Sequence, residues 1–362
     1  MAKKVGIGII GTGFARTVQI PGFLAAGAEI VSVASGSIEN ARSTAEAFGV
    51  GHSTDDWRET VSHSDVDLVC ITTPPKLHKE MTLFAAEQGK HILCEKPMAM
   101  NVAEAEDMTA AAAERPILAL IDHELRFQAG RQEAFGMLRR GDIGKVRHAR
   151  YMFQAPHRGD PNVPWNWWSD IEQGGGALGA INSHIIDSFN WFLGTEVSSV
   201  FCQLQTQIKQ RRDSSGKMRE VTTDDQANML LRFAANEITD DATGLVSVSM
   251  TEGPGYVNRI EFFGSEGSIR VEHLGEVYVA KRGDSDWTPV VTDTGTAIDG
   301  VADTGFSRGF MAFAPKIVEA IRSGQTTIEY AATFADGLKV QRVLDAARES
   351  NASGSEVKLA AE

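Results

Sequence analysis

The first third of the chain alternates short apolar runs with longer segments of helical periodicity. Apolar runs of this length predict buried strands, and the segments between them predict helices. The predicted strands are Val5–Ile10, Glu29–Ala34, Val66–Thr72, His91–Cys94 and Ile117–Ile121, and the predicted helices are Phe14–Ala26, Ile38–Phe48, Lys79–Gln88 and Val102–Ala113. Strands that alternate with helices predict right-handed βαβ units and a parallel sheet covered on both faces.

The pattern changes near Leu125, where long strand-like runs begin to follow one another. Long strands in succession predict an antiparallel or mixed open sheet. The candidates are Lys145–Gln154, Ser198–Lys209, Gln226–Phe233, Gly244–Met250, Asn258–Phe263 and Ser268–His273, with helices at Arg131–Arg140, Met311–Arg322 and Phe334–Ser350, a hairpin tip at Gln210–Arg219 and a loop at Thr292–Thr304. We therefore predict an α/β protein of two domains, residues 1–123 with a parallel sheet and 124–362 with a large, mostly antiparallel sheet.

Composition and charge exclude several classes of protein. The 362 residues are 42% hydrophobic and 23% charged, which is ordinary for a globular protein and argues against disorder. The formal net charge of -13 repels phosphate backbones and anionic lipid heads, so we expect neither nucleic acid nor a membrane as a partner. Three cysteines lie within apolar runs, which is typical of buried thiols in a reducing compartment and favours a cytoplasmic protein: Cys70, Cys94 and Cys202.

A glycine-rich turn follows the first predicted strand and opens a helix. Gly11 and Gly13 allow the backbone to approach a pyrophosphate, whose charge then rests on the helix start, so we assign Gly11, Gly13, Phe14 and Ala15 to dinucleotide binding. The third glycine of the G-x-G-x-x-G pattern is replaced by Arg16. A plain turn without a ligand is the alternative, and the strand–turn–helix context favours binding.

The second predicted strand ends where dinucleotide-binding proteins contact the adenosine ribose. An Asp or Glu there would repel a 2′-phosphate, but the residues are Ser35, Gly36 and Ser37. NADP is therefore favoured over NAD, and Arg42 could reach the 2′-phosphate from the following helix.

A series of motifs across nearly the whole chain resembles the Gfo/Idh/MocA family, the glucose–fructose oxidoreductase and inositol dehydrogenase group. The motifs are Thr72-Thr73-Pro74-Pro75-Lys76-Leu77-His78, Gly89-Lys90-His91-Ile92-Leu93-Cys94-Glu95-Lys96-Pro97, Gly174-Gly175-Gly176-Ala177-Leu178 with His184-Ile185-Ile186-Asp187, Gly264-Ser265-Glu266-Gly267-Ser268 and Phe334-Ala335-Asp336-Gly337-Leu338. The resemblance implies a Rossmann domain, a second α/β domain used for homodimers or homotetramers, and hydride transfer between a pyridine nucleotide and a sugar, polyol or related compound. It also implies cofactor contacts by Thr72, Pro74 and His78.

Lys96 is the residue to which we assign catalysis first. It would lie just past the carboxyl end of a parallel strand, where open α/β sheets bind ligands. Its ammonium can stabilise the alkoxide that develops during hydride transfer. Glu95 could hold that ammonium or the nicotinamide ribose. A cis bond before Pro97 is plausible as an aiming device. Without the family motif, a solvated lysine would be the preferred interpretation of Lys96.

His184 is the second catalytic candidate, because an imidazole titrates near working pH and suits proton transfer at a substrate hydroxyl. Many active members of the family carry an Asp four residues earlier, and here that residue is Ala180. Either His184 works with Lys96 alone, or another residue supplies the carboxylate, or the protein is not a fast enzyme. A nucleotide-binding sensor or co-regulator of the same fold is therefore the alternative function.

Three further residues are assigned to the substrate. Asp187 lies on nearly the same helix face as His184, with a capping or surface carboxylate as the alternative. Arg126 could bind a substrate hydroxyl or carboxylate, or form an interdomain salt bridge. Of Trp165, Trp167 and Trp168 we expect one, assigned as Trp167, to contact the sugar, although such clusters are commonly hydrophobic packing. The sequence contains no H-E-x-x-H and no C-x-x-C, so no metal site is expected.

Overall fold

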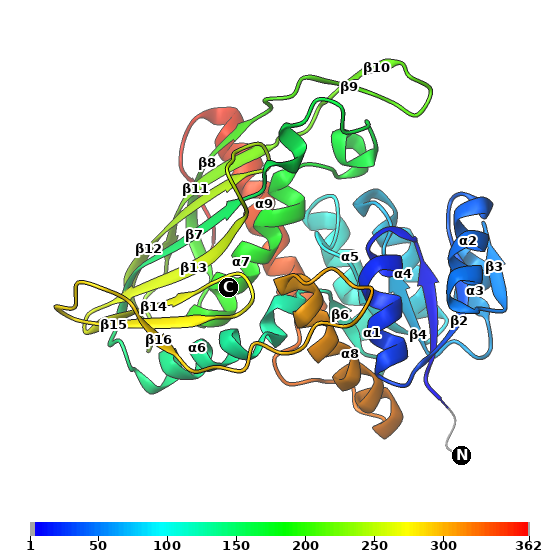
Figure 1. Cartoon of the computed structure of the whole chain (residues 1–362), viewed down its shortest axis with the longest axis horizontal. Coiled ribbons are helices and arrows are strands. Elements are labelled where there is room, and N and C mark those ends of the chain that lie inside the picture. Colours follow the sequence, from blue (N-terminus) through cyan, green and yellow to red (C-terminus); the bar gives the residue numbers. More distant parts are fainter. Residues whose placement is uncertain (1–3, 361–362) are drawn as a thin grey trace. The chain divides into compact units, whose positions relative to one another are not determined.

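The structure is a computed structural model that describes residues 4–360, and its chain divides into two compact units. The first unit comprises the chain up to Phe127 together with Gly295–Leu338, and the second comprises Gln128–Thr294 together with the chain from Lys339. Each unit has its own sheet, labelled in Figure 1. The units are described separately below.

The first unit is built on a parallel sheet that has six strands in the described part of the chain, in the order β3-β2-β1-β4-β5-β6. The strand order reverses between β1 and β4, and ligands of such sheets bind beyond the strand ends at this reversal. The strands are β1 (Gly6–Ile10), β2 (Glu29–Ala34), β3 (His52–Thr54), β4 (Leu68–Ile71), β5 (His91–Cys94) and β6 (Ala119–Ile121). The predicted parallel sheet is therefore confirmed, with β3 added.

Helices connect these strands as predicted, with one addition. They are α1 (Ile20–Ala25), preceded by the π-helical turn η1 (Ala15–Gln19), then α2 (Ile38–Phe48), α3 (Trp57–Ser62), α4 (His78–Glu87) and α5 (Val102–Ala113). The short helix α3 was not predicted. Pro21 lies in the first turn of α1 and has no N–H to donate, which explains why the regular α-helical ladder is interrupted just before it.

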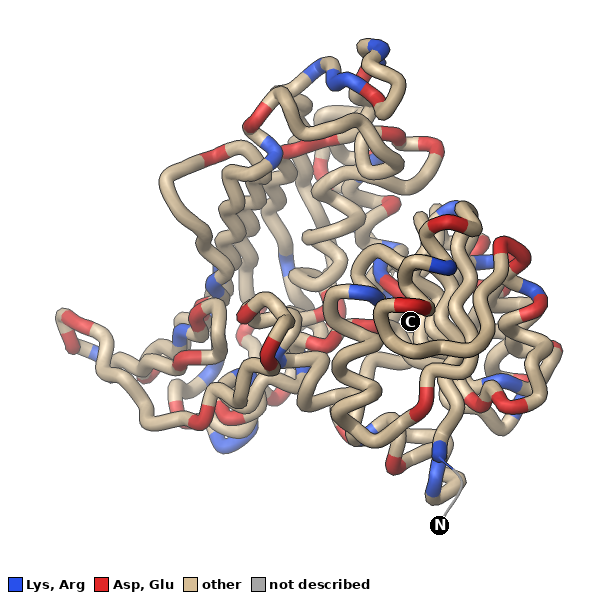
Figure 2. Tube along the Cα trace, turned by 45° about the vertical axis from the view of Figure 1, so that its right-hand side comes forward, with Lys and Arg blue, Asp and Glu red and all other residues tan. Residues whose placement is uncertain are grey.

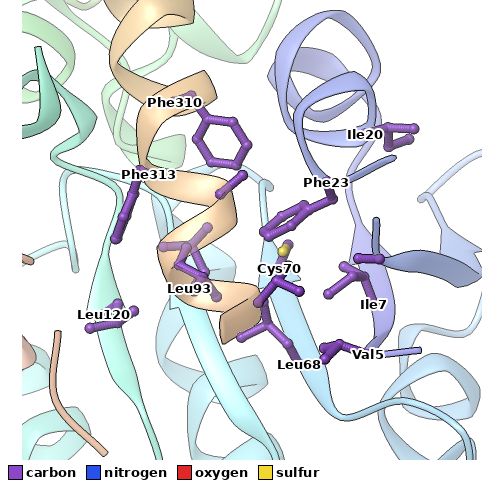
Figure 3. Packing of buried hydrophobic residues seen from close by; sticks show 14 of the residues in the cluster. Val5, Ile7, Ile20, Phe23, Leu68, Cys70, Leu93, Leu120, Phe310 and Phe313 are labelled. Carbon is purple, nitrogen blue, oxygen red and sulfur yellow. The ribbon is translucent and has the colours of Figure 1, made fainter. Parts of the chain in front are cut away.

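A late segment of the chain completes the core of the first unit. Helix α8 (Gly305–Ser323) places Phe310 and Phe313 against the residues that cover one face of the parallel sheet (Figure 3). Phe310 meets Phe23 edge-on at 5.3 Å between ring centroids, and Phe313 stacks on Phe127 at 4.1 Å. The first unit therefore takes in residues 295–338, which the sequence analysis had grouped with the second domain.

The second unit is built on a mostly antiparallel sheet, as predicted, with nine strands in the described residues. Their order is β16-β15-β14-β13-β7-β12-β11-β8-β17, and only β7 and β12 pair in parallel. The strands are β7 (Val146–Gln154), β8 (Val197–Gln205), β11 (Gln226–Phe233), β12 (Thr239–Ser249), β13 (Val257–Gly264), β14 (Gly267–Val271), β15 (Val277–Lys281), β16 (Thr288–Val290) and β17 (Val357–Lys358).

Helices cover one face of this sheet. They are α6 (Ala129–Arg140), α7 (Ser183–Leu193), which follows the π-helical turn η7 (Leu178–Asn182), and α9 (Phe334–Ser353), within which the division of the chain falls. Phe189 and Phe192 of α7 lie against Phe233 and Phe262 of the sheet, at 5.4 and 4.9 Å between centroids. The hairpin of β9 (Gln210–Arg212) and β10 (Met218–Glu220) occupies the predicted hairpin tip, and Figure 2 shows several basic residues along it.

Candidate functional site

The turn after β1 requires glycine at its first position. Gly11 has φ +96°, and its N–H donates to the Ala34 carbonyl at 2.8 Å. A Cβ added at Gly11 would lie 2.4 Å from the Thr72 carbonyl oxygen of the neighbouring strand end. A Cβ added at Gly13 would meet nothing within 4 Å, so the backbone is open on that side. The geometry fits a phosphate group that approaches Gly13 at the start of the helix.

Replacing these two glycines should separate folding from binding. Gly11→Ala places a side chain in a left-handed conformation and against backbone, which should cost about 1–3 kcal/mol of stability and weaken nucleotide binding at least about tenfold. Gly13→Ala should leave the melting temperature unchanged and weaken only nucleotide binding. Calorimetric melting and titration with NADH measure both quantities. Unchanged NADH affinity in both variants would contradict the assignment of this turn.

The residues after Gly13 connect the turn to the body of the first unit. Ala15 is fully buried and Arg16 is exposed. Arg16 Nη1 donates to Ser43 Oγ at 3.3 Å, which lays its guanidinium along α2. Gln19, at the end of η1, is buried and reaches the carboxyl ends of two other strands. Phe14, half-buried at the helix start, packs against the core of the unit.

The end of β2 carries hydroxyl groups, as the sequence indicates. Ser35 and Ser37 are half-buried and Gly36 is exposed. Ser37 caps α2 by accepting from Asn40 N, and its hydroxyl donates to Glu39 Oε2 at 2.8 Å. These contacts lower the pKa of the exposed Glu39 carboxyl, first through the backbone at the helix start and then through Ser37, with nearby Arg42 adding a smaller effect.

In the segment after β4, His78 has a structural role that the sequence analysis did not predict. Thr72 and Pro74 are half-buried at the carboxyl end of the sheet, beside the glycine turn. His78 is fully buried, and its ring nitrogens lie 2.8 Å from the Thr73 carbonyl and 3.1 Å from the Pro97 carbonyl. His78 thereby ties this segment to the one that follows Lys96. Burial lowers the pKa of its imidazole.

Lys96 lies directly after β5, with its side chain 22% exposed and its Nζ 3.9 Å from Glu95 Oε2. The Lys96–Pro97 peptide bond is cis, as predicted. Glu95 is buried, and its Oε1 accepts from Gln19 Nε2 at 3.1 Å. The ammonium of Lys96 is therefore backed by a buried carboxyl group that is linked to the helix of the glycine turn.

Two more carboxyl groups lie in this part of the first unit. Asp122 follows β6 and Glu124 begins the turn η3 (Glu124–Phe127), and both are buried. Burial, followed by repulsion from Glu95, holds the pKa of Asp122 well above its ordinary value. Burial and the two neighbouring carboxyls do the same for the pKa of Glu124. The sequence analysis assigned no role to Gln19, Asp122 or Glu124.

His184 lies in the second unit, on helix α7, and is 3% exposed. Asp187 lies on the same helix and is also buried, which excludes the surface carboxylate considered as its alternative. Ala180 lies in η7, the turn that precedes α7. The glycine run before this turn is held by Asp224: Asp224 Oδ2 accepts from Leu178 N at 2.7 Å, and burial raises the pKa of this carboxyl to about 6.

The remaining predicted substrate residues have contacts of their own. Arg126 is buried in the first unit, donates to the Tyr330 carbonyl at 3.4 Å and lies 3.6 Å from Asp336 Oδ1. This ion pair lies within one unit, so it is not the interdomain bridge considered above. Trp167 is 39% exposed, whereas Trp165 and Trp168 are covered by the guanidinium groups of Arg219 and Arg158, at 3.5 and 3.8 Å from the ring centroids.

The described residues contain neither a metal site nor a helix that could span a membrane. Between residues 4 and 360, no group of three or more His, Cys, Asp or Glu side chains is arranged to hold a metal ion. Over the same part of the chain, no helix has the length and hydropathy needed to cross a bilayer.

Comparison with known proteins agrees with this geometry. Residues 5–123 match the oxidoreductase family with an NAD-binding Rossmann fold, and residues 132–270 match the GFO/IDH/MocA C-terminal domain. Levoglucosan dehydrogenase of Pseudarthrobacter phenanthrenivorans is 30% identical over 89% of this chain and 87% of its own length. Glucose-fructose oxidoreductase domain-containing protein 2 of Xenopus laevis is 28% identical over 98% of this chain and 93% of its own.

Solved structures give the same result. The complex of levoglucosan dehydrogenase with NADH and L-sorbose matches with a TM-score of 0.87 and 29% identity, over the whole of both chains. Aldose-aldose oxidoreductase from Caulobacter crescentus matches with a TM-score of 0.78 and 25% identity, over 98% of this chain and the whole of that one. The fold and the glycine turn define a protein with a dinucleotide-binding Rossmann domain. The chain belongs to the GFO/IDH/MocA family of oxidoreductases.

Proposed function

We propose that the protein transfers a hydride between a nicotinamide cofactor and a hydroxyl or keto carbon of a sugar, polyol or related small molecule. The observation that carries this proposal is the link inside the first unit between the glycine turn and Lys96. Gln19, on the helix that the turn opens, donates to Glu95, the residue before Lys96. The glycine turn, which would hold a pyrophosphate, and a partly exposed ammonium thus share one end of the same sheet.

The residues present fit a dinucleotide. Gly11 and Gly13 with the helix start would hold the pyrophosphate, Ser35–Ser37 would face the adenosine ribose, and Thr72, Pro74 and Glu95 would line the path towards the nicotinamide. When bound, the nicotinamide ring supplies or accepts the hydride. Lys96 would donate a hydrogen bond to the reacting oxygen and stabilise the negative charge that develops there. His184 would give or take a proton at the substrate, with Asp187 beside it on α7.

We infer that the substrate is sugar-like. The structural relative crystallised with NADH binds levoglucosan in one structure and L-sorbose in another, and we carry this substrate class over to the present chain. Trp167 presents an exposed ring of the kind that covers the C–H face of a sugar. Arg126 has its contacts with Tyr330 and Asp336, so Trp167 and Asp187 are the stronger candidates for substrate contact.

The cofactor preference that we propose is NADP. Arg16 reaches Ser43 on α2, and Arg42 lies on the exposed side of that helix, so two guanidinium groups lie on or against the helix that follows β2.

The double substitution R16A/R42A should weaken NADPH binding about tenfold, because each substitution removes a hydrogen bond to the charged 2′-phosphate. It should leave NADH binding nearly unchanged. Titration with both reduced cofactors measures this. An equal loss for NADH and NADPH would overturn the preference.

A second copy of the chain is the partner that we propose. On the face of the second sheet that the helices leave open, Leu230 is 56% exposed and is paired in register with Phe201 and Leu245, which are also exposed. An apolar strip of this kind on a long sheet is typical of a protein interface. Sedimentation velocity distinguishes the expected dimer or tetramer from a monomer.

An absorbance screen tests the hydride transfer. Purified protein would be mixed with NADPH or NADH and pooled keto-sugars, and with the oxidised cofactors and pooled sugars and polyols that include levoglucosan. Loss or gain of reduced-nicotinamide absorbance in any pool supports the proposal.

The second candidate function is a nucleotide-binding sensor. Ala180 favours it, because an alanine cannot orient His184 as a carboxylate would. Tight nucleotide binding without a redox change in any pool would support the sensor.

A further inference from the structure

Two buried carboxyl groups lie side by side at the carboxyl ends of adjacent strands. Cys94 of β5 pairs with Ile121 of β6 in parallel register, so Glu95 and Asp122 are the next residues of the two strands. The Asp122 N–H donates to the Cys94 carbonyl at 2.8 Å, which continues the ladder to this point. Both side chains accept from the same amide nitrogen, that of Gln19, so the two carboxyl groups lie close together. A hydrogen bond between two carboxyl groups forms only when one of them carries a proton.

Gln19 fixes the two carboxyl groups as a pair. Its Nε2 donates to Glu95 Oε1 at 3.1 Å and to Asp122 Oδ2 at 2.8 Å, so one amide group contacts both partners. Gln19 is 1% exposed, Glu95 7% and Asp122 0%, which excludes water as the main source of hydrogen bonds. Among the described residues, no N–H or O–H group donates to the buried Oδ1 of Asp122, and a proton held between the carboxyls would satisfy it.

The titratable groups near this pair are mostly acidic. Lys96 Nζ is the cation next to it, 3.9 Å from Glu95 Oε2. Glu124, from η3, adds a third buried carboxyl, and the thiols of Cys70 and Cys94 lie within the electrostatic influence of Glu95 and Asp122. Two adjacent buried carboxylates beside the Lys96 ammonium would repel each other strongly, so one proton is retained. Burial raises the pKa of Glu95 as well as that of Asp122, although Lys96 acts in the opposite direction on both.

We propose that Glu95 and Asp122 share one proton at neutral pH and that this pair is the proton store of Lys96. In the reduction direction, the substrate oxygen takes a proton from the Lys96 ammonium as the hydride reaches the carbon, and the amine then takes the shared proton from the pair. A proton from solvent restores the pair, and oxidation runs the same transfers backwards. The two electrons of the reaction move with the hydride, and the proton transfers through Lys96 and the pair change no oxidation state. One water or a rotation of the partly exposed Lys96 side chain closes the 3.9 Å separation.

This inference rests on the proposed function and assigns to Lys96 the proton transfer that His184 would make if a carboxylate stood at position 180. The carboxylate that would act through His184 is absent at position 180, whereas a carboxyl pair is built beneath Lys96. Glu95 and Asp122 act through Lys96, so they are positioning and proton-holding residues. Gln19 joins the pair to the helix of the glycine turn.

Infrared spectroscopy tests the shared proton without any turnover. Glu124→Gln removes the third carboxyl and leaves only the pair, so the carbonyl band of one protonated carboxyl group should remain at pH 7. Adding Asp122→Asn should abolish that band, because Glu95 beside Lys96 then ionises. No band at pH 7 in the Glu124→Gln protein, or a band that survives Asp122→Asn, would overturn the proposal. If the double variant fails to fold, carboxyl labelling of aspartate or of glutamate with carbon-13 in the Glu124→Gln protein gives the same answer, because the band must then shift with either label.

Kinetics then tests the use of the proton. Asp122→Asn should lower the single-turnover rate of reduction about a hundredfold and leave NADPH affinity within about twofold, and it should change the pH at which that rate declines. A normal rate and pH profile in Asp122→Asn would refute the role of the pair while leaving hydride transfer intact. A protonated pair in a protein that turns over no substrate would refute the proposed function and leave the shared proton standing.

Discussion

Lys96→Met is expected to lower the rate of hydride transfer by about 10²–10³-fold and to leave nucleotide binding intact. The methionine side chain has nearly the same length but cannot donate a hydrogen bond to the reacting oxygen, and removal of one such donor costs this much in other enzymes. The loss should appear in single-turnover rates at saturating cofactor and substrate. Glu95 then loses the ammonium beside it, so the pH dependence of the remaining rate should change as well.

Lys316→Met provides the matched control. Lys316 belongs to the same unit, lies on α8 and is exposed, so the same substitution should leave both rate and affinity unchanged. A Lys96→Met protein that turns over at the wild-type rate would remove Lys96 from the reaction. Parallel loss of rate and of NADPH binding would instead assign Lys96 to the cofactor.

Phe313→Ala is expected to lower the free energy of unfolding by about 3–5 kcal/mol, the usual cost of truncating a buried aromatic side chain. Phe313 is fully buried, stacks on Phe127 and lies near Phe310 at 6.5 Å between centroids. Urea denaturation followed by circular dichroism measures the change, because the midpoint shifts with stability. The variant tests whether α8 belongs to the core of the first unit (Figure 3).

Lys316→Ala on the exposed side of α8 is the control, and it should change stability by no more than about 0.5 kcal/mol. A similarly small effect of Phe313→Ala would mean that α8 contributes little to the packing of the first unit. Loss of nucleotide binding in Phe313→Ala under conditions where the second sheet remains folded is the complementary expected result, since the glycine turn depends on the first unit.

Local patterning was sufficient for most elements of the fold, because each buried strand is a short apolar run with punctuation on both sides. It missed β3 and α3, since His52-Ser53-Thr54 is polar and α3 is short. It also missed the strands β15, β16 and β17 of the second sheet. It also placed α8 in the second domain. The apolar face with Phe310 and Phe313 predicts a packed helix, but periodicity does not say which sheet the helix covers.

The site was predicted only as far as its motifs extend. Gly11 follows from strand–turn–helix context, and Lys96 from the family motif. The role of Asp122 depends on the pairing of β5 with β6, which places it beside Glu95. The register of the two predicted strands could have indicated this neighbour. Nothing in the sequence around Gln19 indicates that its amide bridges two carboxyl groups more than 70 residues away.

Transfer of deuterium from the cofactor is the measurement that tests hydride transfer most directly. NADPH and NADH carrying deuterium at C4 of the nicotinamide would be incubated with the protein and pooled keto-sugars, and the products analysed by mass spectrometry. We expect one or a few products with a single deuterium bound to carbon, formed by the wild-type chain and Lys316→Met and nearly absent with Lys96→Met. Bound nucleotide that never yields a deuterated product, across sugars, polyols and related ketones, would contradict the enzyme and leave the nucleotide sensor.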